Sequence, residues 1–191
     1  MKKYFVVSDT HFNHRNIIKY CNRPFASIDE MNSELIARWN SVVGKDDVVY
    51  HLGDFAFGPS TEHGKFLSKL NGKIRLVLGN HDCHKVSWYY GIGFEKVYDK
   101  PIIINDNAGH KFILTHRPLE VEYIGNFINI YGHIHNSIVD NAYTKRQACV
   151  CVERHNYTPV ELNSIFNNCA MANDDVFDFQ QSENYVKFNE Q

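Results

Sequence analysis

The chain has 191 residues, of which 43% are hydrophobic and 22% are charged, and its formal net charge is −2. These values fit one folded domain, and they exclude disorder throughout as well as a global basic field that would gather nucleic acid. Apolar runs such as residues 4–7 are far shorter than the ~20 residues of a membrane span. Lys2 and Lys3 precede only four apolar residues, too few for a signal peptide, so we expect a cytoplasmic protein.

In the first half of the chain, predicted strands alternate with predicted helices. Short apolar runs indicate strands at residues 3–7, 47–51 and 74–78. Ser27 and Glu30 form a capping box, which predicts a helix that ends at Val43 before Gly44. A second helix is expected over residues 60–70. This alternation favours βαβ units built around a parallel sheet.

The second half is richer in strands, which we expect at residues 101–104, 111–115, 129–131 and 148–153. Thr158, Pro159 and Glu161 combine a capping box with proline at the first helical position, and they predict a helix to about residue 168. We assign residues 1–169 to one domain and residues 170–191 to a polar C-terminal tail.

Side chains of the kinds that bind metals follow five of the predicted strands. They form the blocks Asp9-x-His11, Gly53-Asp54, Gly79-Asn80-His81-Asp82, His116 and Gly132-His133-x-His135. Open α/β sheets bind their ligands at the carboxyl ends of strands. Residues two apart in an extended segment point the same way, so the paired donors can converge. The glycines leave room for close backbone approach.

Seven donors result, comprising four imidazoles, two carboxylates and one amide oxygen: Asp9, His11, Asp54, Asn80, His116, His133 and His135. Seven donors are too many for one transition metal, and they fit two metals that share a bridging carboxylate. Nitrogen and oxygen donors suit manganese, our first choice, as well as iron, nickel or zinc. Two metals ~3.5–4 Å apart would turn a bridging water into hydroxide and neutralise phosphate oxygens. His81 stays free to protonate a leaving oxygen as general acid.

In their order and spacing, these blocks resemble the calcineurin-like metallophosphoesterases over about residues 1–136. Residues 8–17 and 50–54 are similar to the small stand-alone bacterial and phage members, and residues 156–160 extend the likeness to about residue 168. The resemblance implies a four-layer α/β/β/α sandwich of two mixed sheets flanked by helices.

The resemblance also implies a division of the ligands between two metals. One metal would be held by Asp9, His11, Asp54 and His135. The other would be held by Asp54, Asn80, His116 and His133, which makes Asp54 the bridge. The bridging hydroxide would attack phosphorus in line, with His81 as the acid.

These observations predict a dinuclear metal-dependent phosphodiesterase that acts on a small phosphoester or nucleotide-like substrate. A phosphomonoesterase, a nuclease for single strands or ends, and a non-catalytic scaffold of the same fold are the alternatives. His14, Arg15 and Arg117 lie beside the donor blocks and are candidate contacts for substrate phosphate. Exposed, capping or ion-pairing roles elsewhere are the other interpretation of these three residues.

Overall fold

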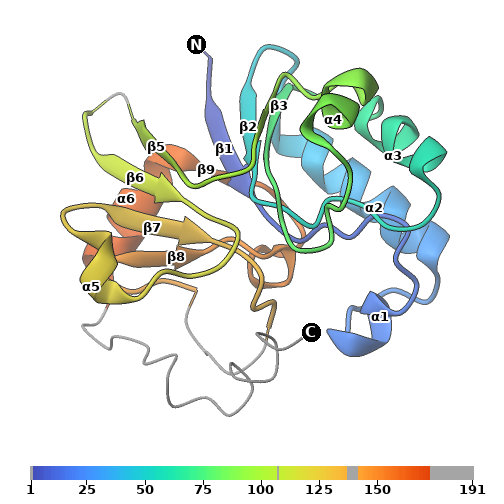
Figure 1. Cartoon of the computed structure of the whole chain (residues 1–191). Coiled ribbons are helices and arrows are strands. Elements are labelled where there is room, and N and C mark those ends of the chain that lie inside the picture. The colour runs from blue at the N-terminus through green and yellow to red at the C-terminus, as the bar shows by residue number, and fades with distance from the viewer. Residues whose placement is uncertain (1, 107, 137–141, 173–191) are drawn as a thin grey trace.

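The computed structural model describes residues 2–106, 108–136 and 142–172, which form two sheets packed face to face (Figure 1). The first sheet contains β1 (Tyr4–Val7), β2 (Val48–His51), β3 (Lys73–Val77), β4 (Lys96–Tyr98) and β9 (Val160–Glu161). Its order is β4-β3-β2-β1-β9, with β9 antiparallel to β1 and the other neighbours parallel.

The second sheet contains β5 (Ile102–Asn105), β6 (Lys111–Leu114), β7 (Ile128–Tyr131) and β8 (Gln147–Cys149). Its order is β5-β6-β7-β8, in which β5 and β6 form an antiparallel hairpin and the remaining pairs are parallel. Two mixed sheets flanked by helices confirm the predicted α/β sandwich.

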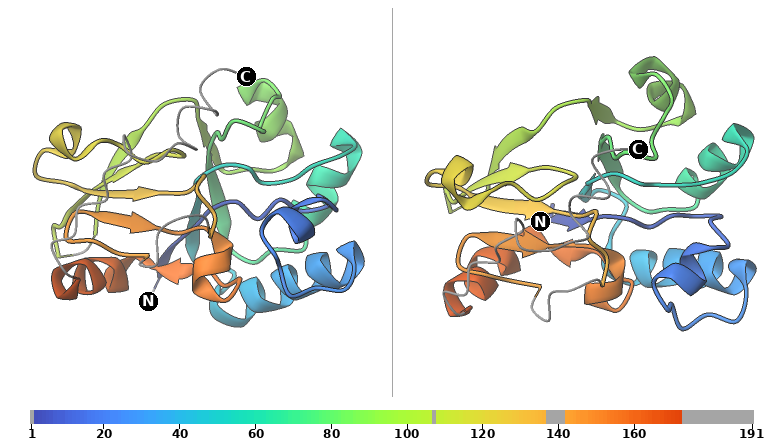
Figure 2. Two further views of the ribbon diagram at one scale, coloured as in Figure 1. Left: turned by 90° about the horizontal axis from the view of Figure 1, so that it is seen from below. Right: turned by 60° about the horizontal axis from the view of Figure 1, so that its bottom comes forward.

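The described helices are α1 (Ile17–Tyr20), α2 (Ile28–Val42), α3 (Ser60–Leu67), α4 (Val86–Ile92), α5 (Val121–Ile124) and α6 (Leu162–Met171). Helices α2, α3 and α4 lie on the face of the first sheet that points away from the second sheet (Figure 2). Helix α6 contacts β1, β9 and β8, so it closes the sandwich where the two sheets meet. The capping box of α2 is confirmed, because Ser27 accepts from the Glu30 amide.

Alternation along β1 divides the core into two parts. Phe5 and Val7 pack toward the helices with Leu35 of α2, whereas Val6 packs toward the second sheet with Ile130. A strand covered on both faces is apolar at successive positions, as this run is. Because both faces of β1 are buried, its apolar run ends at Val7, and the polar residues that follow lie at the carboxyl end of the strand.

Two predicted elements near the C-terminus are wrong. The strand expected at 148–153 ends at Cys149, and Val152–His155 forms a 3₁₀ helix. The helix expected from Thr158 begins only at Leu162, because Val160–Glu161 is β9 and pairs with β1. The open edge of β1 offers hydrogen bonds that a local capping pattern cannot anticipate, and pairing with that edge prevails.

Most of the predicted tail, residues 170–191, lies outside the described residues. Within the described ranges, no helix is long and apolar enough to cross a membrane. The thiols of Cys149 and Cys151 lie 3.5 Å apart, and both are free.

Candidate metal centre

The donor blocks meet where the carboxyl ends of strands from both sheets come together. Strands β1, β2 and β3 are parallel, so the segments that follow them lie along one edge of the first sheet. The ends of β6 and β7 approach this edge from the second sheet. Hydrogen bonds join the two sheets here: the Ser8 amide donates to the Val150 carbonyl, and the His133 amide donates to Asp9 Oδ2 at 2.8 Å.

Unusual backbone conformations aim the donors inward. Five of the seven donor residues have positive φ angles: Asp9 (60°), His11 (49°), Asp54 (57°), His133 (71°) and His135 (49°). Such values are uncommon for residues other than glycine, and they cluster at functional sites. The predicted close approach at glycine is also present. A Cβ atom on Gly132 would overlap Ser8 Oγ and Asp9 Oδ2, and one on Gly79 would overlap Asp54 Oδ1.

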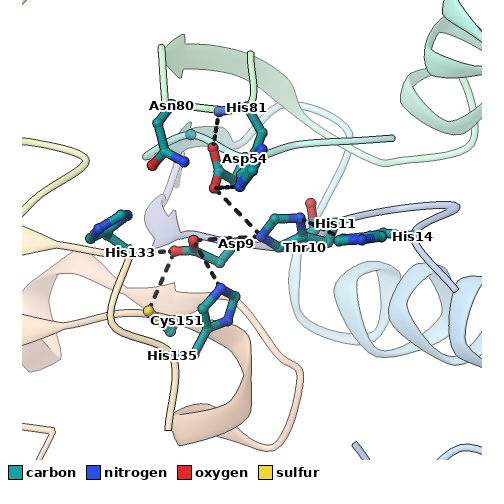
Figure 3. A network of polar contacts seen from close by, with 12 residues as sticks. Asp9, Thr10, His11, His14, Asp54, Asn80, His81, His133, His135 and Cys151 are labelled. Carbon is teal, nitrogen blue, oxygen red and sulfur yellow. Dashed lines mark hydrogen bonds and ion pairs between the residues drawn. The ribbon is translucent and has the colours of Figure 1, made fainter. Parts of the chain in front are cut away.

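A first donor group surrounds Asp9 and reaches Asp54 (Figure 3). His135 Nε2 lies 3.6 Å from Asp9 Oδ1. His11 Nε2 lies 3.9 Å from the same oxygen and 3.5 Å from Asp54 Oδ2. Atoms that bind one ion at ~2.0–2.2 Å are about 3–4 Å apart, so these separations fit a shared metal.

A second donor group shares Asp54 with the first. Asp54 Oδ2 lies 3.7 Å from His116 Nε2, which in turn lies 2.8 Å from Asn80 Oδ1 and 3.2 Å from His133 Nδ1. His116 Nδ1 lies 2.8 Å from the Leu52 carbonyl, so its hydrogen donates there and Nε2 presents a lone pair. The structure thus brings all seven predicted donors together in two groups joined by Asp54.

Unsatisfied atoms test whether the site fits a metal. Asp9 and His11 are buried, with 0% and 2% of their surface exposed. Asp9 Oδ1 and His11 Nε2 nevertheless have no hydrogen-bond partner among the described residues. Buried polar atoms are normally paired, and a cation between these two atoms would satisfy both. The donor set and its geometry therefore fit a bound metal ion.

The acidities of these groups are strongly perturbed. Burial, together with the charge of Asp9, raises the pKa of Asp54 to about 7. Burial also raises the pKa of Asp9, but the nearby histidines His135, His116 and His11 outweigh it and lower that pKa overall. Burial lowers the pKa of His133 to about 3. Two carboxylates this close repel each other, and a bound cation would relieve that repulsion.

His81 and the three candidate substrate contacts lie around this centre. The His81 side chain is 46% exposed, and its Nε2 lies 4.0 Å from Asp54 Oδ2. His14 Nδ1 lies 3.4 Å from His11 Nδ1, and its ring stacks on Phe57 with 4.1 Å between centroids. Arg117 is half-buried and close enough to lower the pKa of His133, whereas Arg15 is exposed.

Three buried residues near the donors were missed as site residues. Asp82 accepts hydrogen bonds from the amides of Asp54, Phe55 and Gly79, so it ties the second donor block to the third. Its place in the third block was a signal that could have identified it. Arg23 and Glu153 form a buried ion pair behind the site, and no local motif marks either of them.

Comparison with known proteins agrees with this geometry. The model of the calcineurin-like phosphoesterase superfamily domain matches residues 3–152. An uncharacterized protein of Methanocaldococcus jannaschii is 42% identical over 173 residues, which cover 86% of this chain and 90% of that protein. The gene 66 protein of Mycobacterium phage L5 is 28% identical over 179 residues, covering 77% of this chain and 84% of its own.

A solved structure, that of a protein of unknown function from Aquifex aeolicus, shares the fold with a TM-score of 0.69. The two sequences are 27% identical, and the match covers 87% of this chain and 99% of that chain. The family match spans the five donor blocks and most of both sheets. The chain therefore belongs to the calcineurin-like phosphoesterase superfamily.

Proposed function

We propose that this protein is a phosphodiesterase that uses two divalent metal ions, preferably manganese, to hydrolyse a small nucleotide-like phosphoester. The observation that carries the proposal is the position of Asp54. Its Oδ2 lies 3.5 Å from His11 Nε2 and 3.7 Å from His116 Nε2, so one carboxylate oxygen belongs to both donor groups. A shared carboxylate can hold two metals at the ~3.5–4 Å separation of two-metal sites.

The two groups would divide the ligands as the family resemblance implies. The first metal would be held by Asp9, His11, Asp54 and His135. The second would be held by Asp54, Asn80, His116 and His133. When bound, divalent metals supply the Lewis acidity that activates water and neutralises charge on a phosphate. Among these donors Asp9 is buried and Asn80 is exposed, so substrate would approach the metals from the side of Asn80.

In this proposal His81 is the general acid. Its backbone amide donates to Asp54 Oδ1 at 2.9 Å, which fixes the residue beside the centre. Its side chain is among the more exposed in the site, so the imidazole can reach a substrate bound at the open side. A histidine there can deliver a proton to the leaving oxygen as the P–O bond breaks.

Aromatic rings at the rim support a nucleotide-like substrate. Phe57 stacks on His14, and its ring centroid lies 5.3 Å from that of His81. Tyr20, which is 73% exposed, lies edge-on to His14. Aromatic faces beside a phosphate site can stack with a nucleobase. His14 and Arg117 would contact the phosphate, and Arg15 would contact parts of the substrate farther from the metals.

Hydrolysis of bis-p-nitrophenyl phosphate and p-nitrophenyl phosphate tests the proposal, using protein stripped with chelator and reloaded with manganese. We expect two manganese ions per chain and faster turnover of the diester. Asp106→Asn is a matched control, because Asp106 is a carboxylate that pairs with His110 outside the donor groups. Preference for the monoester would indicate a phosphomonoesterase. Full metal loading without turnover of either ester would favour a scaffold.

A further inference from the structure

A buried ion pair lies directly behind the first donor group. Arg23 and Glu153 are 130 residues apart in the sequence, yet their side chains are only 0% and 2% exposed. Glu153 Oε1 accepts from Arg23 Nη2 at 2.6 Å and from Arg23 Nε at 2.9 Å. If either side chain moved away, the other would be left as an unpaired buried charge. Each side chain therefore holds the other in place.

The carboxylate of this pair also orients a metal donor. Glu153 Oε1 lies 2.9 Å from Nδ1 of His135. When the Nδ1 hydrogen donates to Glu153, the Nε2 atom of the same ring presents its lone pair toward Asp9 Oδ1, 3.6 Å away. A carboxylate behind a metal-binding histidine fixes both the tautomer and the direction of the ring.

The guanidinium of the pair holds the turn that carries two more donors. Arg23 Nη2 donates to the Asp9 carbonyl at 2.8 Å, and Nη1 donates to the Thr10 carbonyl at 2.9 Å. This turn contains two of the positive φ angles, at Asp9 and His11. Such conformations persist where surrounding contacts impose them, and these two hydrogen bonds are among the contacts that hold this turn, together with those from the Asp9 and His11 amides to Gly53 and Asp54.

A different role for these atoms would be a metal site of their own. Cys21, His135 and Glu153 offer three ligand atoms within 4.8 Å of one another. Arg23 donates twice to Glu153 Oε1, and the positive charge of its guanidinium opposes a cation at either oxygen of this carboxylate, including Oε2, which has no described partner. The ion pair therefore supports the neighbouring donor group better than it forms a separate site.

The second donor group is oriented by other means. His116 Nδ1 is held by the Leu52 carbonyl at 2.8 Å, and neither Arg23 nor Glu153 has a described hydrogen bond to His116, Asn80 or His133. A change in the ion pair should therefore affect the two groups unequally.

We propose that Arg23 and Glu153 are positioning residues that set the metal affinity of the group formed by Asp9, His11, Asp54 and His135. They affect the other group less, because its described links to the first are Asp54 and the hydrogen bond from the His133 amide to Asp9. This inference rests on the proposed function, because it requires that both groups bind metal. Residues that orient a metal ligand typically contribute about 10–100-fold to metal affinity.

Calorimetric titration of the chelator-stripped full chain with Mn²⁺ tests the inference. The variants are Glu153→Gln, which keeps the size of the side chain but removes its charge, and Arg23→Lys, which keeps the charge but loses the fork of donors. Glu95→Gln is the matched control, since Glu95 forms a 2.6 Å ion pair with Arg75 away from the donor groups.

We expect the wild type to bind two Mn²⁺ ions. Glu153→Gln and Arg23→Lys should each raise one Kd about 10–100-fold and raise the other, whose group shares Asp54, by a smaller factor. Glu95→Gln should change neither Kd. Two unchanged Kd values in a folded Glu153→Gln variant would overturn the inference and leave the proposed function intact. Fewer than two ions bound by the wild type would refute the proposed dinuclear centre itself.

A measurement on the wild type covers the case in which the variants do not fold. Nitrogen-15 NMR of the Zn²⁺-loaded protein reports which ring nitrogen of each histidine carries hydrogen. We expect His135 to carry it on Nδ1, where Glu153 accepts it. Hydrogen on Nε2 instead would overturn the proposed role of Glu153, whatever the fate of the variants.

Discussion

His81→Ala should slow the hydrolysis of diesters with poor leaving groups by about 10²–10⁴-fold while both metals remain bound. A leaving alkoxide is a strong base, so its departure depends on a proton from the enzyme. A leaving p-nitrophenolate is stable as an anion and depends on that proton much less. The same variant should therefore lose less than about tenfold on bis-p-nitrophenyl phosphate.

The structure indicates why the effect should be confined to proton transfer. The contact of His81 with Asp54 Oδ1 is made by the backbone amide, at 2.9 Å, and alanine keeps it. The side chain is 46% exposed, so its removal opens no cavity in the core. The expected loss on poor leaving groups corresponds to about 2.7–5.4 kcal/mol of transition-state stabilisation, at 1.36 kcal/mol for each factor of ten.

The assay compares kcat for an alkyl diester and for the bis-p-nitrophenyl ester, with the metal content of each sample measured in parallel. His110→Ala is the matched control, because it removes the same kind of side chain at the opposite end of β6 from the candidate donor His116. An equal loss of rate for both leaving groups would refute the acid role of His81. Loss of metal from His81→Ala would show that its side chain supports the centre instead.

Three further changes probe the site and the core. Asp54→Asn should weaken the binding of both metals, since both donor groups share this carboxylate. If elemental analysis found two metal ions per chain in this variant, Asp54 would not be a bridging ligand. Gly132→Ala should destabilise the fold by about 1–3 kcal/mol, because its Cβ overlaps Ser8 and Asp9; an unchanged thermal midpoint would count against that contact. Leu35→Ala in the buried face of α2 should cost about 2–5 kcal/mol in denaturant unfolding without changing kcat of the folded protein.

Local patterns were sufficient to select the seven candidate donors that the fold brings together. Asp9, Asn80 and His133 each follow a strand whose end is marked by a change from apolar to polar residues. Because β1, β2 and β3 are parallel, their carboxyl ends lie at one edge, and knowing where each strand ends is enough to predict that Asp9, Asp54 and Asn80 converge. The packing of the two sheets brings His116 and His133, which follow β6 and β7, to the same edge. The start of α2 was equally predictable, because its capping box is complete within four residues.

Other features depend on contacts between distant parts of the chain. The capping pattern at Thr158 is a genuine local signal, yet residues 160–161 pair with β1, which is far away in the sequence. The pairing of Arg23 with Glu153 spans 130 residues, and neither residue belongs to a motif. Sequence periodicity reports which face of an element is apolar. It carries no information about which charged side chains become neighbours once the sheets have packed, so only the tertiary structure decided how the candidate metal donors are held.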